Sequence, residues 1–321
     1  MKRHHQILAA VLVVQVILGV VVFWPRSAAT AEQEPLFPDL NVDDVVSLTV
    51  VNAAGETVFL RQVDGEWVLP EAGDYPVLGE QVASLLEKIA GLTTGRLVTR
   101  TEASHRRLQV ASDEFQRRID VELADGTEHT LYLGSSPRFG VTHVRVAGQN
   151  ETYLSDEVSA MDAGATASAW IDTAYVSVPP EEVTAVTLEN GQGTFDFSRD
   201  EEGNWTLEGL DADEVLGQAA VSAVVRQATT VRMVAPLGTE ERSEYGLDDP
   251  NAVATIETTG GSITVAVGAP GEDENTYVVH SSESSYYVLA SQAAVGGLVD
   301  TAREDLLTEP PTPTPEGTSG E

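Results

Sequence analysis

Apolar and polar residues alternate along short stretches of the chain, which is typical of half-buried β-strands. Within residues 45–69, apolar side chains occupy every second position around Leu48 and again around Leu60. Gly55 and Gly65 separate these stretches, and glycine tolerates the positive φ that tight hairpin turns need. The pattern predicts three strands joined by two short turns.

The same pattern occurs twice in the chain. A shift of 138 positions aligns residues 45–69 with residues 183–207 without a gap, and nine of the 25 aligned residues are identical. Both turn glycines are among the identities, and so is a tryptophan, Trp67 in one copy and Trp205 in the other. A repeat of this length indicates two homologous domains rather than a solenoid of short units. We expect both tryptophans to pack in the core of their domains.

A helix is predicted after each group of three strands. Apolar residues recur at three- and four-residue steps over residues 77–92, and more sparsely over residues 215–224. Further strands follow in each copy, and each copy is expected to close with a helix of small residues, near 156–163 and 291–305. Short turns join neighbouring strands, which favours antiparallel pairing.

The first thirty residues contain a continuous apolar run. Residues 7–24 are 18 uncharged residues that follow Lys2 and Arg3. A helix of this length spans about 27 Å, close to the roughly 30 Å of bilayer hydrocarbon. The run predicts a single-pass anchor in the cell membrane, with the N-terminus in the cytoplasm and the bulk of the chain extracytoplasmic. A signal peptide cleaved after the small residues 29–31 is the alternative, and it also places the bulk outside the cytoplasm.

These signals together predict an α+β fold, in which an N-terminal transmembrane helix precedes two tandem homologous domains of mainly antiparallel strands with packed helices. The expected organisation is a cytoplasmic N-terminus (1–6), an anchor (7–24), a tether (25–40), a first repeat (41–176), a second repeat (179–308) and a disordered Pro/Thr-rich tail (309–321).

The composition argues against a nucleic-acid partner and excludes chemistry that needs a thiol. The 321 residues carry a formal net charge of −33, which argues against a nucleic-acid partner because phosphate binding needs clustered basic residues. The chain has no cysteine, so disulfides, thiolate metal sites and cysteine nucleophiles are excluded. Residues 41–160 have a net charge of 10 − 19 = −9, whereas residues 179–309 have 5 − 25 = −20.

Basic residues gather in the first repeat and form a candidate interface. Its members are Arg96, Arg100, Arg106, Arg107, Arg117 and Arg118. Such a cluster suits anionic lipid head groups or an acidic surface of a protein partner. The alternative is that each arginine pairs locally with one of the many carboxylates.

No catalytic or cofactor motif is present, so we expect no cofactor and no enzyme activity. The histidines do not form a set with zinc-ligand spacing, and the acidic loops lack the spacing of a calcium loop. Two other functions stay open. One is an extracytoplasmic module for a sugar, peptide or metal that uses the aromatic pairs Trp67/Trp205 and Tyr153/Tyr287. The other is an envelope hydrolase with two facing carboxylates.

A loop in the second repeat has a distinctive sequence. It reads Tyr245-Gly246-Leu247-Asp248-Asp249-Pro250, about forty residues after the G-x-W-x-L segment at 203–207. The first repeat keeps G-x-W-x-L at 65–69, but the counterpart of the loop, residues 107–110, has lost the motif. We expect the loop to be a structural corner in which Gly246 adopts positive φ, Asp248 caps a turn and Pro250 fixes the exit.

The two motifs resemble those of a family known as domain of unknown function 4340, over roughly residues 42–306. The resemblance implies an N-terminal membrane segment with one or more copies of the domain. It also implies an association with transport systems of the ATP-binding-cassette type. No catalytic residue is attached to the family. The sequence therefore favours a membrane-anchored, extracytoplasmic, non-catalytic accessory or scaffold protein, with transporter subunits or envelope proteins as its partners.

Overall fold

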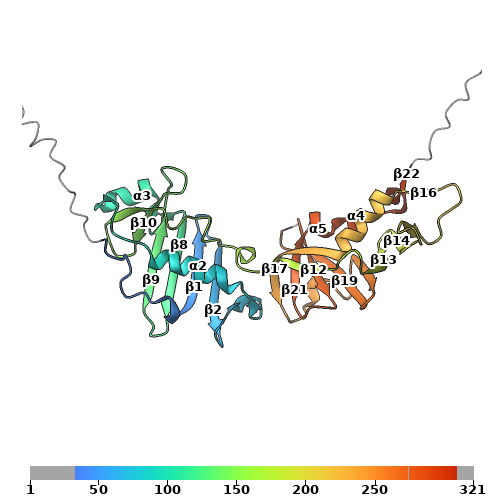
Figure 1. Ribbon diagram of the computed structural model, residues 1–321, viewed down its shortest axis with the longest axis horizontal. Helices are drawn as coiled ribbons and strands as arrows, with labels where there is room; N and C mark the ends of the chain where they lie inside the picture. Colours follow the sequence, from blue (N-terminus) through green and yellow to red (C-terminus); the bar gives the residue numbers. More distant parts are fainter. Residues whose placement is uncertain (1–32, 274, 309–321) are drawn as a thin grey trace, which may run out of the picture.

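A computed structural model describes residues 33–273 and 275–308 of the chain. Two lobes lie side by side along the long axis of the molecule, and each lobe is built on one nine-stranded sheet (Figure 1). All neighbouring strands within both sheets are antiparallel. The alternation in the sequence produces such sheets because successive side chains of a strand point to opposite faces.

The first sheet consists of β1 (Val45–Asn52), β2 (Thr57–Val63), β3 (Glu66–Leu69), β4 (Tyr75–Pro76), β5 (Leu97–Thr99), β8 (Arg117–Leu123), β9 (Glu128–Leu133), β10 (Thr142–Val146) and β11 (Thr152–Ser155). Its spatial order is β4-β3-β2-β1-β8-β9-β10-β11-β5. A separate small hairpin is formed by β6 (Val110–Ala111) and β7 (Glu114–Phe115).

The second sheet consists of β12 (Ala174–Ser177), β13 (Val183–Asn190), β14 (Gly193–Arg199), β15 (Trp205–Leu207), β17 (Thr230–Gly238), β18 (Ala252–Thr258), β19 (Gly261–Pro270), β20 (Thr276–Ser281) and β21 (Tyr287–Ser291). Its spatial order is β12-β17-β21-β20-β19-β18-β13-β14-β15. A short pair is formed by β16 (Val215–Leu216) and β22 (Leu307–Thr308).

Helices are few in the described part of the chain. The α-helices there are α2 (Gly79–Ala90), α3 (His105–Leu108), α4 (Gln218–Thr229) and α5 (Gln292–Asp300). The 3₁₀ helices are η1 (Val42–Asp44), η2 (Pro70–Ala72), η3 (Glu102–Ser104), η4 (Ala167–Ala169), η5 (Ser243–Tyr245) and η6 (Arg303–Leu306). The apolar stripe of α2 is buried at Val82, Leu85, Leu86 and Ile89, because a helix stripe of this kind must pack on another element.

The two lobes repeat one arrangement. In each, a three-stranded meander leads through one helix to a strand on the far side of the sheet, which is the edge strand β5 in the first sheet and β17, next to the edge strand β12, in the second. A backbone hydrogen bond just before the helix is also repeated in the two lobes. The N–H of Leu78 donates to the carbonyl of Trp170 at 2.7 Å, and the N–H of Gly217 donates to that of Leu306 at 2.8 Å.

The expected fold class, α+β, is wrong because it gave helices too large a share of the structure. The described chain is mostly antiparallel sheet, with helices as a minor component. The helix expected near 156–163 is absent from the described structure, and turns take its place. Asp162 explains the turns, because its carboxylate accepts hydrogen bonds from the backbone N–H and the hydroxyl of Ser159 at 2.8 and 2.7 Å. Such local side-chain bonds compete with helix formation.

The expected transmembrane helix also needs correction. In residues 33–273 and 275–308, no helix has both the length and the apolar character needed to cross a bilayer. The described residues therefore do not contain the transmembrane helix that the expected fold class included. Residues 7–24, on which that expectation rested, lie outside the described residues, as does the predicted tail 309–321. The extracytoplasmic location stays a prediction.

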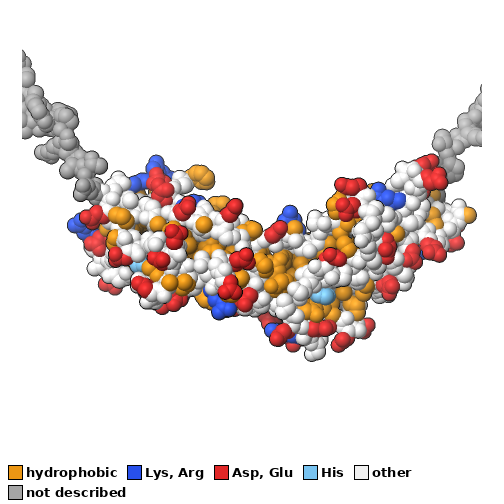
Figure 2. All heavy atoms as spheres, turned by 60° about the horizontal axis from the view of Figure 1, so that its bottom comes forward, with side chains coloured by type: hydrophobic (Ala, Val, Ile, Leu, Met, Phe, Trp, Pro, Cys, Tyr) orange, Lys and Arg blue, Asp and Glu red, His pale blue; other side chains and the backbone are white. Residues whose placement is uncertain are grey.

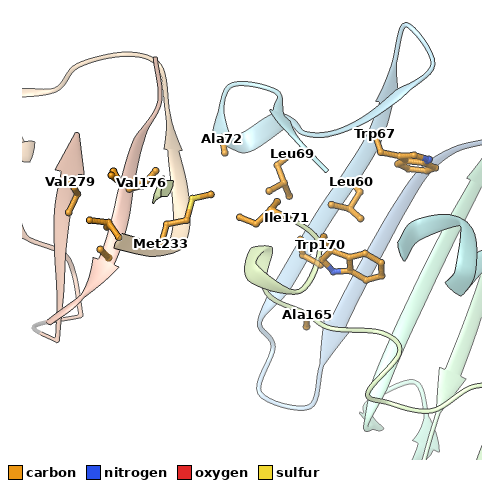
Figure 3. Close-up of a cluster of buried hydrophobic side chains, with 14 of the residues drawn as sticks. Leu60, Trp67, Leu69, Ala72, Ala165, Trp170, Ile171, Val176, Met233 and Val279 are labelled. Carbon is orange, nitrogen blue, oxygen red and sulfur yellow. The ribbon is translucent and has the colours of Figure 1, made fainter. Parts of the chain in front are cut away.

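The lobes meet at an apolar junction in the middle of the molecule, where hydrophobic side chains gather on the face shown in Figure 2. Figure 3 shows Leu69 and Ile171 on the side of the first sheet, opposite Val176 and Met233 of the second. One buried cluster includes residues of both lobes. Since the core is continuous, we expect the lobes to hold each other in one arrangement.

Two glycines and two tyrosines complete the junction. A Cβ added to Gly73, after η2, would lie 3.3 Å from the Cα of Gly238 at the end of β17, so the two backbones touch. The rings of Tyr75 and Tyr286 meet edge to face with centroids 4.7 Å apart. The Tyr286 hydroxyl also lies 3.4 Å from the carbonyl oxygen of Gly73. The η2 side of the first lobe thus packs on the β17 side of the second.

Candidate functional site: a pocket floored by Arg145

A pocket of about 830 Å³ lies in the first lobe, beside α3. This is the outer end of the lobe, away from the junction (Figure 1). Its lining comes from η3, α3, the β6–β7 hairpin, β9, β10 and the turn that follows β10. Arg145 and Tyr132 contribute to it from neighbouring strands of the sheet.

The strand pattern explains why an arginine lies there. Arg145 stands between Val144 and Val146 on β10, so the valines face the core and the arginine faces the opposite side of the sheet. It is paired across the strands with Tyr132 of β9, and its guanidinium carbon lies 4.5 Å from the centre of the tyrosine ring. This cation–π contact fixes the arginine on the sheet.

Backbone carbonyls hold the guanidinium. Nε of Arg145 donates to the carbonyl of Val110 at 2.6 Å, and Nη1 donates to that of Gln149 at 3.2 Å. Nη2 has no hydrogen-bond partner among residues 33–273 and 275–308. Arg145 is only 6% exposed, and burial lowers its pKa, although Tyr132 and Glu102 act in the opposite direction.

Arg145 therefore carries a buried charge with no carboxylate in contact. None of the ion pairs within the described part of the chain includes it. Glu102 at the rim acts on it only through space. A buried charge is costly unless it is compensated, and carbonyl dipoles compensate it only in part. The arrangement favours an anionic group in the pocket.

The rim adds polar groups on both sides. Arg106 pairs with Asp113 across the opening, so these two charges largely neutralise each other. Nε2 of the buried His105 lies 3.0 Å from the carbonyl oxygen of Asn150, which ties α3 to the turn after β10. The uncompensated positive charge of the pocket is therefore that of Arg145 at its floor, because Arg106 at the rim is paired with Asp113.

The corner that covers Arg145 has the same backbone geometry as the motif loop of the second lobe. Gly246 has φ of +65°, and Gln109 in the first lobe has φ of +56°. A Cβ on Gly268 would lie 2.1 Å from the carbonyl oxygen of Tyr245, and one on Gly134 would lie 2.2 Å from that of Leu108. Each corner therefore needs a glycine beneath it, directly after β9 in the first lobe and within β19 in the second.

The other motif residues have unequal roles. Tyr245 is buried and lies against Tyr287, with ring centroids 5.3 Å apart. Leu247 packs near Gly268. Asp248 is exposed, and its carboxylate makes no hydrogen bond to any described residue, so it does not cap the turn as we expected. Pro250 leads into β18.

The sequence model of the family described as "Domain of unknown function (DUF4340)" matches residues 67–250. The chain belongs to the DUF4340 family. The match runs from Trp67 of the first lobe to Pro250 of the motif loop, so it includes the pocket and most of the junction, but not Tyr286. No curated protein and no solved structure matches this DUF4340 chain.

Both hallmark tryptophans of this DUF4340 chain are buried. Trp67 and Trp205 are 8% and 7% exposed. The backbone of Trp205 is bonded to the side chain of Gln218, and Arg199 lies over its ring at 4.7 Å. Buried rings cannot form an exposed platform for a ligand, so the aromatic binding module loses its main support.

The tyrosines proposed with them do not form an equivalent pair. Tyr153 on β11 lies opposite Leu97 of β5, and the residue at the same place in the second sheet is Val288, opposite Pro236 of β17. Tyr153 is also buried.

The six predicted interface arginines are dispersed. Arg96 pairs with Asp156 at 3.5 Å and Arg118 with Asp120 at 2.9 Å, and Arg117 donates to the carbonyl of Ala163 at 2.8 Å. Arg106 reaches the pocket rim. Within residues 33–273 and 275–308, Arg100 and Arg107 take part in no ion pair.

The sequence analysis did not identify Arg145, whose charge is buried without a carboxylate in contact. The signal was present: a single arginine inside the β-branched, half-apolar segment Thr142–Val146. An arginine in such a strand must either reach solvent or find buried partners. Which of the two applies depends on the corner at 105–111, far away in sequence.

Neither a metal centre nor an acid catalyst stands out in the part of the chain that the structure describes. The described residues contain no group of three or more histidine, aspartate or glutamate side chains placed to hold a metal ion. Hydrogen bonds lower the pKa of Asp125, Asp200 and Glu214, whereas a carboxyl acting as a general acid near neutral pH needs a raised pKa.

Proposed function

We propose that this DUF4340 chain is a non-catalytic accessory or scaffold protein that binds an acidic segment of a protein partner in the Arg145 pocket. The observation that carries the proposal is the buried guanidinium of Arg145, which lines the pocket, has no carboxylate in contact, and makes no hydrogen bond from Nη2 to a described residue. A partner carboxylate would complete its hydrogen bonds and neutralise its charge.

The size of the pocket and the charge of the chain narrow the ligand class. A cavity of about 830 Å³ holds several side chains rather than a single small ion. The net charge of −33 repels long polyanions such as nucleic acid. A short acidic stretch of polypeptide, with one carboxylate on Arg145 and polar neighbours on the mainly polar lining, meets both conditions. The association with a transport system of the ATP-binding-cassette type rests on the family resemblance and stays a prediction.

Fluorescence anisotropy with a labelled, glutamate-rich hexapeptide tests the proposal. We expect binding that weakens at least tenfold in Arg145→Gln, because a charge-assisted hydrogen-bond pair contributes about 1.5–3 kcal/mol. The same peptide with glutamine in place of glutamate should not bind. Arg242→Gln is the matched control, since it removes one exposed arginine charge from the second lobe.

Folding of the variants is checked by thermal denaturation, because Arg145 also bonds the corner. Arg106→Gln, at the exposed rim, provides a variant that leaves those bonds in place, and we expect it to weaken binding two- to fourfold. Equal affinity of a folded Arg145→Gln protein and the unmodified chain for the peptide would disprove the proposal.

A further inference from the structure

The lobes contact each other through unlike surfaces. The first lobe contributes its η2 side, and the second contributes its β17 side. A contact between unlike surfaces of two copies is a head-to-tail contact, and it leaves one complementary surface unused at each end. The unused surfaces are the β5 side of the first lobe and the segment 208–214 of the second, at opposite ends of the molecule (Figure 1).

The β5 side is the counterpart of the covered β17 side. Leu97 lies opposite Tyr153 on β11, as Pro236 lies opposite Val288 on β21. The end of β17 is packed by Gly73 and η2, whereas β5 pairs on one edge only among the described strands. Leu97 and Val98 are 42% and 40% exposed there. An uncovered edge strand presents unpaired backbone groups to which a segment of another chain can bind.

The segment 208–214 is the counterpart of the η2 side. Both segments connect a G-x-W-x-L strand to a helix, and both end at the repeated backbone contact before that helix. In the first lobe the connection packs on β17, but in the second lobe it is exposed from Glu208 to Asp213. Leu210 on this segment is 37% exposed.

The two surfaces have opposite charge. Residues 96–107 contain one glutamate and four arginines, of which Arg96 and Arg106 are paired with carboxylates of the same lobe. Residues 208–214 contain no basic residue and four carboxylates, of which only Glu214 is in an ion pair within the described structure. Arg100 has no ion pair in the described structure, and neither has Asp211. Opposite charge steers two surfaces together and fixes their orientation.

We propose that copies of this chain associate head to tail, with the β5 side of one copy receiving the segment 208–214 of the next. The contact repeats the arrangement that already joins the two lobes. Because the surfaces are unlike, each added copy leaves one of them free for a further copy, so the association forms rows or rings rather than closed pairs. The proposal goes beyond the binding of an acidic partner, since Leu97, Val98 and Arg100 do not line the Arg145 pocket.

Cysteine cross-linking of the full chain tests this contact, because the chain has no cysteine of its own. The double variant Val98→Cys/Leu210→Cys places one thiol on β5 and the other on the segment 208–214. These two segments lie at opposite ends of the molecule in Figure 1, so the thiols should pair between copies rather than within one copy. Under mild oxidation we expect a ladder of dimers, trimers and higher species on a non-reducing gel. The control is Val98→Cys/Phe139→Cys, in which the second thiol is fully exposed elsewhere in the first lobe.

Charge reversal separates a specific contact from random collision. Added to the cross-linking pair, Arg100→Glu should slow formation of the ladder at least fivefold, and Asp211→Arg in the same chain should restore it. Arg242→Glu, with the same change of charge in the second lobe, should have no effect. A ladder no faster than that of the Phe139 control, or one indifferent to Arg100→Glu, would overturn the proposal.

Discussion

Two charged side chains of the first lobe show how single residues obtain partners within the fold. Arg145 is held by carbonyl oxygens and an aromatic ring, whereas Asp162 is held by Lys88 and Ser159. Asp162 has its partners within the chain, so its role is structural. Arg145 has a donor left over, which is why we assign binding to it rather than to the more numerous surface arginines.

The carboxyl of Asp162 makes stability depend on pH. Burial, the largest single influence, raises its pKa, but the hydrogen bonds from Lys88 and Ser159 outweigh burial and hold the pKa below its ordinary value of 3.8. The stabilisation is therefore present above about pH 4 and is lost as the pH falls through the lower pKa of the folded state.

We expect Asp162→Asn to lower the free energy of unfolding at pH 7 by about 1 kcal/mol, a modest value because the pair is partly exposed. The difference from the unmodified chain should shrink towards pH 3. Urea denaturation at pH 7, 5 and 3 measures it, with the exposed Asp39→Asn as control. A difference that stays constant down to pH 3 would contradict the assignment.

At the scale of elements, the two lobes stabilise the same edge of the three-stranded meander with different contacts. In the first lobe, β4 pairs with the edge of the meander, and the N–H of Val77 donates to the carbonyl of Trp67 at 2.9 Å. In the second lobe, the side chain of Gln218 takes that place. It accepts from the N–H of Trp205 at 2.8 Å and donates to its carbonyl at 2.7 Å. A side-chain amide thus replaces a strand.

Gln218→Ala should free this edge of β15. Both backbone groups of Trp205 lose their partner, so we expect about 1–3 kcal/mol less stability. The amide of Trp205 should also exchange with solvent much faster, which hydrogen exchange followed by NMR measures. Gln192→Ala, on an exposed turn, is the control, and equal exchange of the Trp205 amide in both variants would refute this account.

At the scale of the whole molecule, net charge opposes compactness. The net charge of −33 is spread over both lobes, and acidic side chains are scattered over the face in Figure 2. Like charges within one compact body repel each other, and salt screens this repulsion over about 10 Å at 0.1 M. The apolar junction and the continuous core act against the repulsion.

Salt should therefore stabilise the protein. Between 10 mM and 300 mM sodium chloride we expect the midpoint of thermal unfolding to rise by several degrees, most steeply below 100 mM. Scanning calorimetry measures it, and sucrose at equal osmolarity controls for effects other than screening. A midpoint that falls with salt would show that attractive ion pairs outweigh the net repulsion.

The sequence by itself determined the family and the location of many strands. Alternation around Leu48 and Leu60 depends only on which face of a strand meets the core, so it is visible locally. The motif at 245–250 and the G-x-W-x-L segments identified the family. The sequence was misleading where local bonds compete with a helix, as Asp162 shows.

Only the tertiary structure decided what Arg145 does and how the copies face each other. The partners of Arg145 come from a corner 35 residues earlier in the chain and from the turn after its own strand, and no local pattern records such a meeting. The unlike surfaces of the junction depend likewise on how two whole sheets pack. Local periodicity specifies strands, but contacts between distant segments form the pocket and the junction.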